Sequence, residues 1–258
     1  MIIIKSASEI ERMRAACAAA AEILAAVAAL VQPGRTTTEL NEAAGELIKK
    51  NGGKSPFLGY KGYPGHICVS VNEEVVHGIP GSRRVQYGDI VSLDVGIILD
   101  GFVGDNATTV AVGVAEPRTQ ELLRVTEQAL AAGIDAARAG NRVGDISSAV
   151  QTLVEARGFS VVREFVGHGV GRRMHEEPQV PNFGRAGEGP KLKSGMTLAI
   201  EPMINAGTSE VQMLGDGWTV VTADGSPSAH FEHTVLITEG EAEILTWQKK
   251  SPYKSKAR

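Results

Sequence analysis

Four carboxylates stand in segments that otherwise have the composition of buried β-strands. Asp94 lies in Val-Ser-Leu-Asp-Val, Asp105 in Val-Gly-Asp-Asn-Ala, Glu201 in Leu-Ala-Ile-Glu-Pro and Glu232 in His-Phe-Glu-His-Thr. Because charge is almost never buried without a partner, carboxylates placed in this way predict a shared cation. His168, in Gly-His-Gly-Val-Gly, can add a nitrogen ligand, although a histidine in a glycine loop is more often structural. Carboxylates with one histidine suit two divalent transition metals, which can activate a water and polarise a carbonyl, so the pattern indicates hydrolysis.

A β-hairpin is expected to bring two of these carboxylates together. Asp100-Gly101 is a strong signal for a two-residue turn, and strand-like sequence lies on both sides of it. With that turn, Asp94 pairs with Ala107 and Asp105 pairs with Gly96. The two aspartates are then diagonal neighbours on one face of the hairpin. For this pair taken alone, a solvent-facing position on a half-exposed hairpin is the alternative.

The remaining histidines fall into two groups. His77, in Val-Val-His-Gly-Ile-Pro, and His175, in Met-His-Glu-Glu-Pro, each precede a sharp break in the chain, where a side chain can project into a cleft. His66, His230 and His233 have no comparable context, and we interpret them as structural or surface residues.

The elements that hold these residues occur twice along the chain. Helical patterns cover 8–31, 36–50, 117–139 and 145–157, and strand-like runs cover 89–99, 102–112, 196–204, 218–222 and 230–238. The glycines that end the first pair of helices, Gly34 and Gly52, correspond to Gly140 and Gly158 in the second half. This repeat predicts two α+β halves related by a pseudo-twofold axis, with antiparallel sheet in the middle and helices outside.

The first helix is the segment most easily mistaken for something else. Residues 15–31 are apolar apart from Glu22, as in the middle of a signal peptide, but most of them are alanine. Ser8 and Glu11 form the expected capping box, which starts an amphipathic helix ahead of this run. No other segment approaches the ~20 consecutive apolar residues of a membrane span.

The composition excludes several classes of protein. With 43% hydrophobic and 22% charged residues among 258, the chain can bury a sizeable core and is neither disordered nor collagen-like. A net charge of −4 gives no general attraction to nucleic acid or to an anionic membrane. Two cysteines, Cys17 and Cys68, are too few for a disulfide framework, which suits a reducing cytoplasm.

Taken together, these motifs resemble the methionine aminopeptidases of the type I bacterial form. The resemblance covers nearly the whole chain. Its motifs are Asp94 with Asp105 eleven positions on, Gly-His-Gly-Val-Gly-x-x-x-His-Glu-Glu-Pro over 167–178, Ile-Glu-Pro over 200–202, Glu232, Leu-Gly-Tyr-x-Gly-Tyr-Pro over 58–64 and His-Gly-Ile-Pro over 77–80. It implies the pita-bread fold in a single catalytic domain, 1–258, with halves of about 1–112 and 113–247. The basic tail, 248–258, is expected to be frayed and solvated.

The resemblance also implies roles for the residues of the centre. Two divalent ions, of Co, Mn, Fe, Zn or Ni, are expected to share it. Asp94 would bind one ion, Asp105 and Glu232 would bridge the two, and His168 and Glu201 would bind the other. Glu201 would accept a proton from the metal-bound water that attacks the first peptide bond. His77 and His175 would be catalytic histidines outside the metal shell, in contact with substrate.

A methionine pocket is implied beside the metals. Its residues would be Phe57, Tyr60, Tyr63, Cys68, Met174 and Trp218, together with His77 and His175. Two positions depart from the family pattern, which usually has cysteine where this chain has Phe57 and phenylalanine where it has Met174. We expect the volume of the pocket to be roughly kept, because one wall gains the bulk that the other loses.

The implied function is removal of the initiator methionine from new proteins when the second residue is small and uncharged. The implied partners are N-terminal Met-Xaa peptides of nascent chains and, transiently, the ribosome, with no membrane and no specific nucleic acid, for a cytoplasmic monomer. A prolidase-like enzyme is a second hypothesis, although those relatives generally carry an additional domain. A metal-free binding protein of the same fold would be expected to lack ligands, and a calcium site conflicts with His168.

Overall fold

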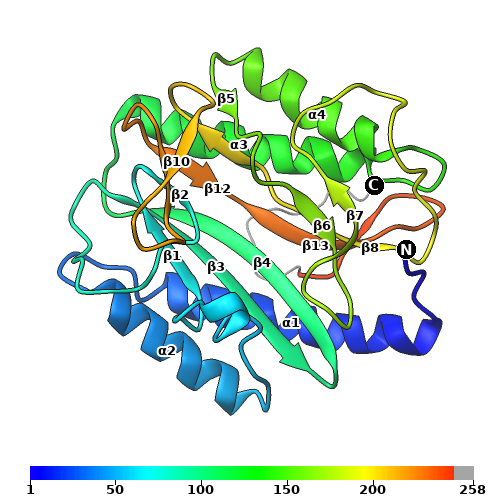
Figure 1. Ribbon diagram of the computed structural model, residues 1–258, viewed down its shortest axis with the longest axis horizontal. Coiled ribbons are helices and arrows are strands. Elements are labelled where there is room, and N and C mark those ends of the chain that lie inside the picture. The colour runs from blue at the N-terminus through cyan, green and yellow to red at the C-terminus, as the bar shows by residue number, and fades with distance from the viewer. Residues whose placement is uncertain (247–258) are drawn as a thin grey trace.

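The computed structural model describes residues 1–246, so the expected basic tail 248–258 lies outside the described residues. Figure 1 shows a curved central sheet with α1 and α2 on one side and α3 and α4 on the other. The helices are α1 Ala7–Ala28, α2 Thr37–Lys50, α3 Pro117–Ala136 and α4 Val143–Glu155, with one 3₁₀ turn, η1, at Tyr60–Gly62. None of the helices in residues 1–246 is long and apolar enough to cross a membrane.

All four predicted helices are present, but the predicted start of the first one is wrong. The helix begins at Ala7 with Ser6 as its N-cap, and Glu9 accepts hydrogen bonds from the Ser6 backbone nitrogen and hydroxyl, both at 3.0 Å. The sequence matches the capping-box pattern twice in overlapping positions, at Ser6 and at Ser8. The earlier match is used because the Lys5 nitrogen donates to the Gly195 oxygen, which holds the chain extended up to that point.

The central sheet is antiparallel throughout and has the strand order β1-β3-β4-β13-β8-β6-β7, with β14 paired to β13. Its strands are β1 Cys68–Val71, β3 Ile90–Leu99, β4 Phe102–Ala111, β6 Gly167–Gly169, β7 Glu176–Val180, β8 Thr197–Ile200, β13 Glu232–Leu236 and β14 Glu243–Ile244. The predicted hairpin is confirmed as β3 and β4, with Asp100 and Gly101 both at positive φ in the turn.

Two predicted strands are each divided into two. The run 196–204 forms β8 and then β9, Met203–Asn205, with Glu201 and Pro202 between them. The run 230–238 forms the end of β12, Ser228–His230, and then β13. In the first run the chain leaves the central sheet for a small sheet, β12-β9-β5, and in the second it returns from that small sheet to the central sheet. The second small sheet has the order β10-β11-β2, and the remaining strands are β2 Glu74–Val76, β5 Ser160–Val161, β10 Val211–Met213 and β11 Val220–Thr222.

Two apolar cores lie against the two pairs of helices. In one, Ile23, Leu40 and Ile48 of α1 and α2 pack with Leu93 and Ile97 of β3. In the other, α3 and α4 pack on β8 and β13. A separate core against each pair of helices is what two halves would produce. The boundary between residues 112 and 113, which falls between β4 and α3, stays a prediction. Both cysteines are buried free thiols.

Candidate metal centre and active site

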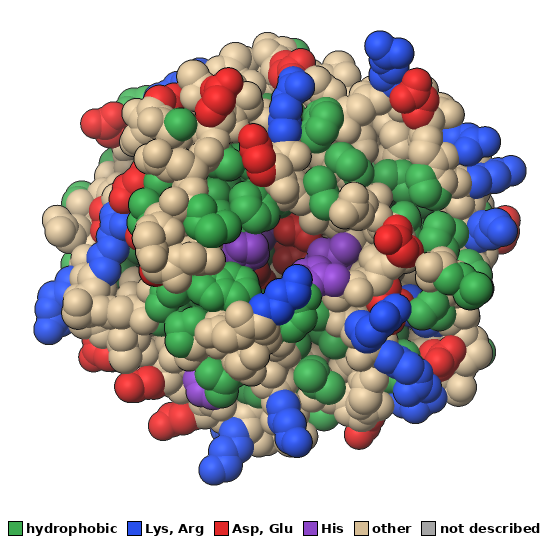
Figure 2. All heavy atoms as spheres, viewed as in Figure 1, with side chains coloured by type: hydrophobic (Ala, Val, Ile, Leu, Met, Phe, Trp, Pro, Cys, Tyr) green, Lys and Arg blue, Asp and Glu red, His purple; other side chains and the backbone are tan. Residues whose placement is uncertain are grey.

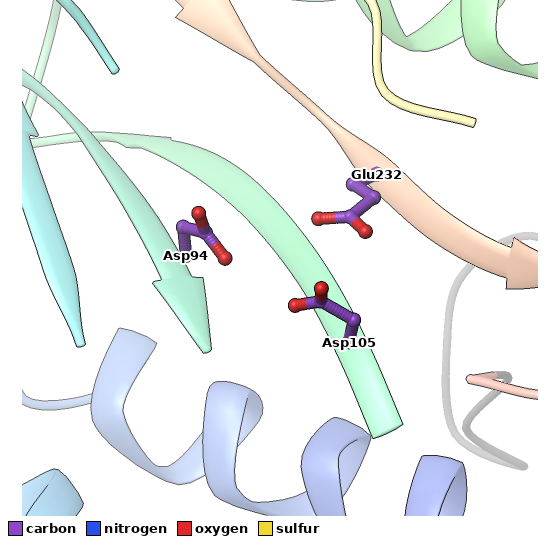
Figure 3. Close-up of side chains that lie close together, drawn as sticks. All are labelled: Asp94, Asp105 and Glu232. Atoms are coloured by element: carbon purple, nitrogen blue, oxygen red, sulfur yellow. The ribbon is translucent and has the colours of Figure 1, made fainter. Parts of the chain in front are cut away.

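Three adjacent strands of the central sheet aim carboxylates at one point. The register of β3 and β4 places Asp94 opposite Ala107 and Asp105 opposite Gly96, as the turn predicts. β13 then pairs with the other edge of β4 and places Glu232 opposite the same Ala107. Figure 3 shows the three carboxylates directed toward one another, with ligand oxygens that lie within 4.8 Å of one another. The sheet register therefore builds this cluster.

The chemistry of these carboxylates fits a cation. Asp94 Oδ1, Asp105 Oδ1 and Glu232 Oε1 are buried and have no hydrogen-bond partner within residues 1–246. Burial, followed by repulsion from the neighbouring carboxylates, raises the pKa of Asp94 and of Glu232 well above the ordinary values. Burying carboxylate oxygens that have no partner and repel one another is unfavourable. Positive charge between them removes this penalty, so divalent ions suit the cluster.

His168 lies at the edge of the cluster with one ring nitrogen free to bind. Its Nδ1 is 2.9 Å from the backbone oxygen of Gly169, an arrangement that assigns the ring proton to Nδ1 and leaves the Nε2 lone pair available. That Nε2 lies 3.4 Å from Glu201 Oε1 and 3.9 Å from Asp105 Oδ2. Burial lowers the pKa of His168 to about 4, so the ring is neutral near pH 7 and suited to bind a metal.

Glu201 reaches the cluster because the strand breaks at this residue. Pro202 cannot donate to a ladder, so β8 ends at Ile200 and the Glu201 side chain leaves the sheet plane toward His168. The side-chain amide of Asn182 donates to the Glu201 backbone oxygen at 3.0 Å, which fixes the break. Burial raises the pKa of Glu201 to about 8. A carboxyl with this pKa is suited to exchange a proton near neutral pH.

The carboxylates line the floor of a single cavity, in which the structure places every candidate site residue of the sequence. The lining includes Phe57, Tyr60, Tyr63, Cys68, His77, Asp94, Asp105, His168, Met174, His175, Glu201, Trp218 and Glu232. Figure 2 shows this hollow with acidic atoms at its bottom, histidines at its edges and hydrophobic side chains around it. The geometry brings the predicted ligands and the predicted pocket residues together, while their individual roles remain to be tested.

One wall of the cavity is apolar. Phe57, Tyr63, Cys68 and Met174 belong to one buried cluster, and Trp218 packs against it. The Tyr63 and Trp218 rings meet edge to face with centroids 5.1 Å apart. The Tyr63 hydroxyl donates toward two backbone oxygens, those of Gly78 at 2.9 Å and Ile67 at 3.2 Å, so its proton is already engaged. This wall therefore offers contact surface rather than polar groups, which suits an unbranched apolar side chain.

His77 and His175 both line the cavity, but their rings contact different neighbours. The His77 ring meets Trp218 edge to face at 5.9 Å, and burial lowers the pKa of His77 to about 4. His175 Nδ1 is 3.0 Å from the Tyr60 hydroxyl, and the His175 ring lies 4.5 Å from that of His168. Burial and the charge of Lys61 lower the pKa of His175. Both rings are therefore neutral near pH 7, so each can donate a hydrogen bond from one nitrogen.

The structure corrects the interpretation of one histidine. His230, which we interpreted as a structural or surface residue, is buried with its Nε2 3.5 Å from Glu201 Oε2. The sequence held a usable signal, because residues two apart on extended chain share a face and Glu232 is two positions away. His233 faces elsewhere and bonds to Thr246 through Nδ1 at 2.8 Å. Further lining residues were not anticipated: Lys61, Val76, Phe165, Val166 and Met203.

Stability of the metal-free protein is expected to fall as the pH rises from 7 to 9. Burial and neighbouring charge raise the pKa of Asp105 and of Glu201 to about 8, so the folded state holds protons that the unfolded state has released. The contribution of these groups to the free energy of unfolding is fully present below pH 4, and it is lost as the pH rises through their raised pKa values in the folded state. The buried histidines have lowered pKa values and are neutral in both states above pH 7, so they add no opposing slope.

Melting curves of metal-stripped protein at several pH values test this expectation. The same protein with Mn²⁺ serves as the control, since bound cations neutralise the carboxylates and should remove the decline. An equal slope with and without metal would contradict the assignment of these groups.

A cluster of buried carboxylates with one histidine, at the floor of a cavity with an apolar wall, is typical of metal-dependent hydrolases. The chain belongs to metallopeptidase family M24, whose model matches residues 11–239. It is 52% identical to a methionine aminopeptidase of Clostridium perfringens over 246 residues, which are 95% of this chain and 99% of that one.

Solved structures show the same relationship. The crystal structure of methionine aminopeptidase from Thermotoga maritima matches with a TM-score of 0.94 and 50% identity, over 96% of this chain and 100% of that one. Prolidase from Pyrococcus furiosus matches with a TM-score of 0.78 and 24% identity, over 96% of this chain and 66% of that one, and this likeness shows the fold alone. The pita-bread fold that the sequence predicts is thus confirmed.

Proposed function

We propose that this protein is a metal-dependent aminopeptidase that removes the initiator methionine from new proteins. The observation that carries the proposal is the carboxylate cluster of Asp94, Asp105 and Glu232 at the floor of a cavity with an apolar wall. Such a cavity can take up one apolar side chain and hold the peptide bond that follows it over the cluster. The relatives named methionine aminopeptidase support this choice of substrate.

The residues at the cluster would divide the metal-binding work. Asp94 would bind one ion, Asp105 and Glu232 would bridge, and His168 with Glu201 would bind the second ion. Ions held there supply a Lewis acid for the scissile carbonyl and lower the pKa of a water. Cobalt, manganese, iron, zinc or nickel would each suit a set of four carboxylates and one imidazole.

The chain's own groups would then position the substrate and move its protons. Glu201, charged when the cations are bound, would accept a proton at its carboxylate during attack and return it to the leaving amine. His175, held by Tyr60, would donate a hydrogen bond to the substrate carbonyl region. His77 would contact the scissile amide from the other side of the cavity. A bulky second residue would clash beside the two histidines, so small, uncharged residues are favoured there.

Peptide hydrolysis with controlled metal content tests the proposal. Metal-stripped protein is assayed on Met-Ala-Ser and Met-Leu-Ser, with and without added Mn²⁺ or Co²⁺. We expect metal-dependent release of methionine from Met-Ala-Ser and at least ~100-fold less from Met-Leu-Ser. Absence of cleavage with any metal by a folded protein would overturn the proposal and favour a binding role for the same cavity.

The partners and location follow from this activity. N-terminal Met-Xaa peptides of nascent chains would be the substrates, met by a monomeric protein in the cytoplasm during transient contact with the ribosome. A formylated amine does not fit a site for a free one, so a deformylase would have to act first.

The two unusual pocket residues should be energetically coupled. Phe57 and Met174 belong to the same buried cluster and line the same cavity. Phe57→Cys alone should raise the KM for Met-Ala-Ser by roughly tenfold by leaving space, and Met174→Phe alone should raise it by overfilling the pocket. The double variant should recover most of the loss. Steady-state kinetics of the four proteins provide the cycle, and strictly additive effects would contradict the shared volume.

A further inference from the structure

His230 directs a ring nitrogen at Glu201 from outside the lining of the cavity. His230 is the last residue of β12 and is 2% exposed. Its Nε2 lies 3.5 Å from Glu201 Oε2. Among the described residues this nitrogen has no hydrogen-bond partner. The distance exceeds that of a normal hydrogen bond by about 0.5 Å, and catalytic hydrogen bonds are often long in proteins without bound ligands.

The two oxygens of Glu201 face two different histidines. Oε1 lies 3.4 Å from His168 Nε2, beside the carboxylate cluster, whereas Oε2 lies 3.5 Å from His230 Nε2. Rotation of the carboxylate exchanges these oxygens or moves both away from the cluster. A hydrogen bond from one side would fix that rotation and keep one oxygen directed at the position of the metal.

The backbone of His230 is held firmly enough for this task. Its nitrogen donates to Thr109 Oγ1 at 2.9 Å, and its oxygen accepts from the same hydroxyl at 2.8 Å. The Thr109 hydroxyl in turn meets Ser92 Oγ at 2.8 Å, inside the sheet. β12 also pairs with β9, which places His230 opposite Met203, two residues beyond Glu201. Both residues are thus mounted at the same junction between sheets.

A merely space-filling role does not account for the ring. A buried polar atom without a partner destabilises the folded protein, a cost that an apolar side chain at this position would avoid. His233, on the adjacent strand, shows the ordinary arrangement, with a hydrogen bond to Thr246. Among the described residues, the carboxylate that lies within ion-pair distance of the unsatisfied His230 nitrogen is that of Glu201.

We propose that His230 is a positioning residue that donates its Nε2 hydrogen to Glu201 Oε2 and so presents Oε1 to the metal beside His168. The proposal rests on the proposed function, in which Glu201 is a ligand and proton acceptor. A hydrogen bond from the His230 ring to the ionised Glu201 carboxylate is stronger than one between two neutral groups. The ion held by His168 and Glu201 should therefore depend on His230, whereas the ion held by Asp94 should not.

Metal binding provides a readout that is separate from catalysis. Metal-stripped protein is titrated with Mn²⁺ in a calorimeter, as wild type, His230→Gln and His230→Leu. We expect His230→Leu to bind one of the two ions about 10–100-fold less tightly, with the affinity for the other ion changed less than about threefold. His230→Gln, whose amide can still donate, should recover most of the affinity. Equal affinities in all three proteins would overturn the proposal.

Four controls separate positioning from folding. His233→Leu removes a half-buried histidine of the next strand along the chain and should leave Mn²⁺ affinity unchanged. Melting of the metal-free variants reports their stability. If His230→Leu does not fold, His230→Asn replaces it, and because its shorter amide cannot reach Glu201, it should show the loss of Mn²⁺ affinity expected of His230→Leu. In a Glu201→Gln background, His230→Leu should cause no further loss of affinity, and a full additional loss would contradict action through Glu201.

The steady-state constants distinguish this proposal from the proposed function. With saturating Mn²⁺, His230→Leu should lower kcat on Met-Ala-Ser by about 10-fold and leave KM within about twofold. If the wild type releases methionine and all variants match it in affinity and kcat, the role of His230 alone is refuted. If the wild type binds no Mn²⁺ and releases no methionine, the proposed function fails and the inference fails with it.

Discussion

Glu201→Gln should lower kcat on Met-Ala-Ser by about 10³-fold at saturating metal. The amide has the shape of the carboxyl but cannot accept and return a proton, and positioned general bases contribute ~10²–10⁴-fold. The effect should fall on kcat, because the apolar wall that would hold the methionine side chain is untouched. Steady-state kinetics over a range of Mn²⁺ concentrations separate this loss from weaker metal binding.

The control for this variant is Glu210→Gln, which changes an exposed glutamate in the same stretch of sequence. It should retain wild-type kcat and KM. If Glu201→Gln kept more than about a tenth of the wild-type kcat, another group would have to accept the proton.

Asp105→Asn should have opposite effects on metal binding and on metal-free stability. Asp105 lies on β4, between the strands that carry Asp94 and Glu232, and in the proposed assignment it is shared by both ions, so its loss should weaken Mn²⁺ binding by at least ~100-fold. The same change removes a buried charge that repels Glu201. At pH 9 the metal-free variant should therefore melt several degrees above the metal-free wild type, at about 2–4 °C for each kcal/mol gained.

Calorimetric titration and melting of the same preparations check both effects. Asp100→Asn, in the exposed hairpin turn, is the matched aspartate control and should leave Mn²⁺ affinity unchanged. A metal-free Asp105→Asn protein that is less stable than the wild type at pH 9 would show that Asp105 stabilises the fold without metal, contrary to its raised pKa.

The sequence predicted the centre of the molecule well because the relevant signals are local. The turn at Asp100-Gly101 fixes the register of the hairpin, and the register alone makes Asp94 and Asp105 neighbours. The helices are present for a similar reason, since their apolar stripes and caps are read within a few residues. The meeting of Glu232 with this hairpin depends on the pairing of distant strands, and there the family resemblance, rather than the local pattern, supplied the expectation.

What the sequence did not reveal depends on breaks and on long-range contacts. The runs 196–204 and 230–238 looked continuous, because nothing in their periodicity shows that the chain passes between two sheets at Glu201 and at Phe231. Those breaks bring His230 within 3.5 Å of Glu201, a contact that we did not predict, and they place it in the interior rather than at the surface. Lys61 also lines the cavity, and its backbone has a positive φ in η1, a conformation that a lysine in the sequence does not indicate.

The carboxylates and the histidine come from both sides of the interval between β4 and α3. Asp94 and Asp105 lie before it, and His168, Glu201 and Glu232 lie after it. A repeated architecture therefore holds one centre rather than two, and neither repeat has enough donors to keep a pair of ions by itself. Bound metal would act as a non-covalent crosslink between the two halves of the chain. At a hundredfold excess over Kd, each ion would stabilise the folded protein by about 2.7 kcal/mol, and this energy would hold the two halves together.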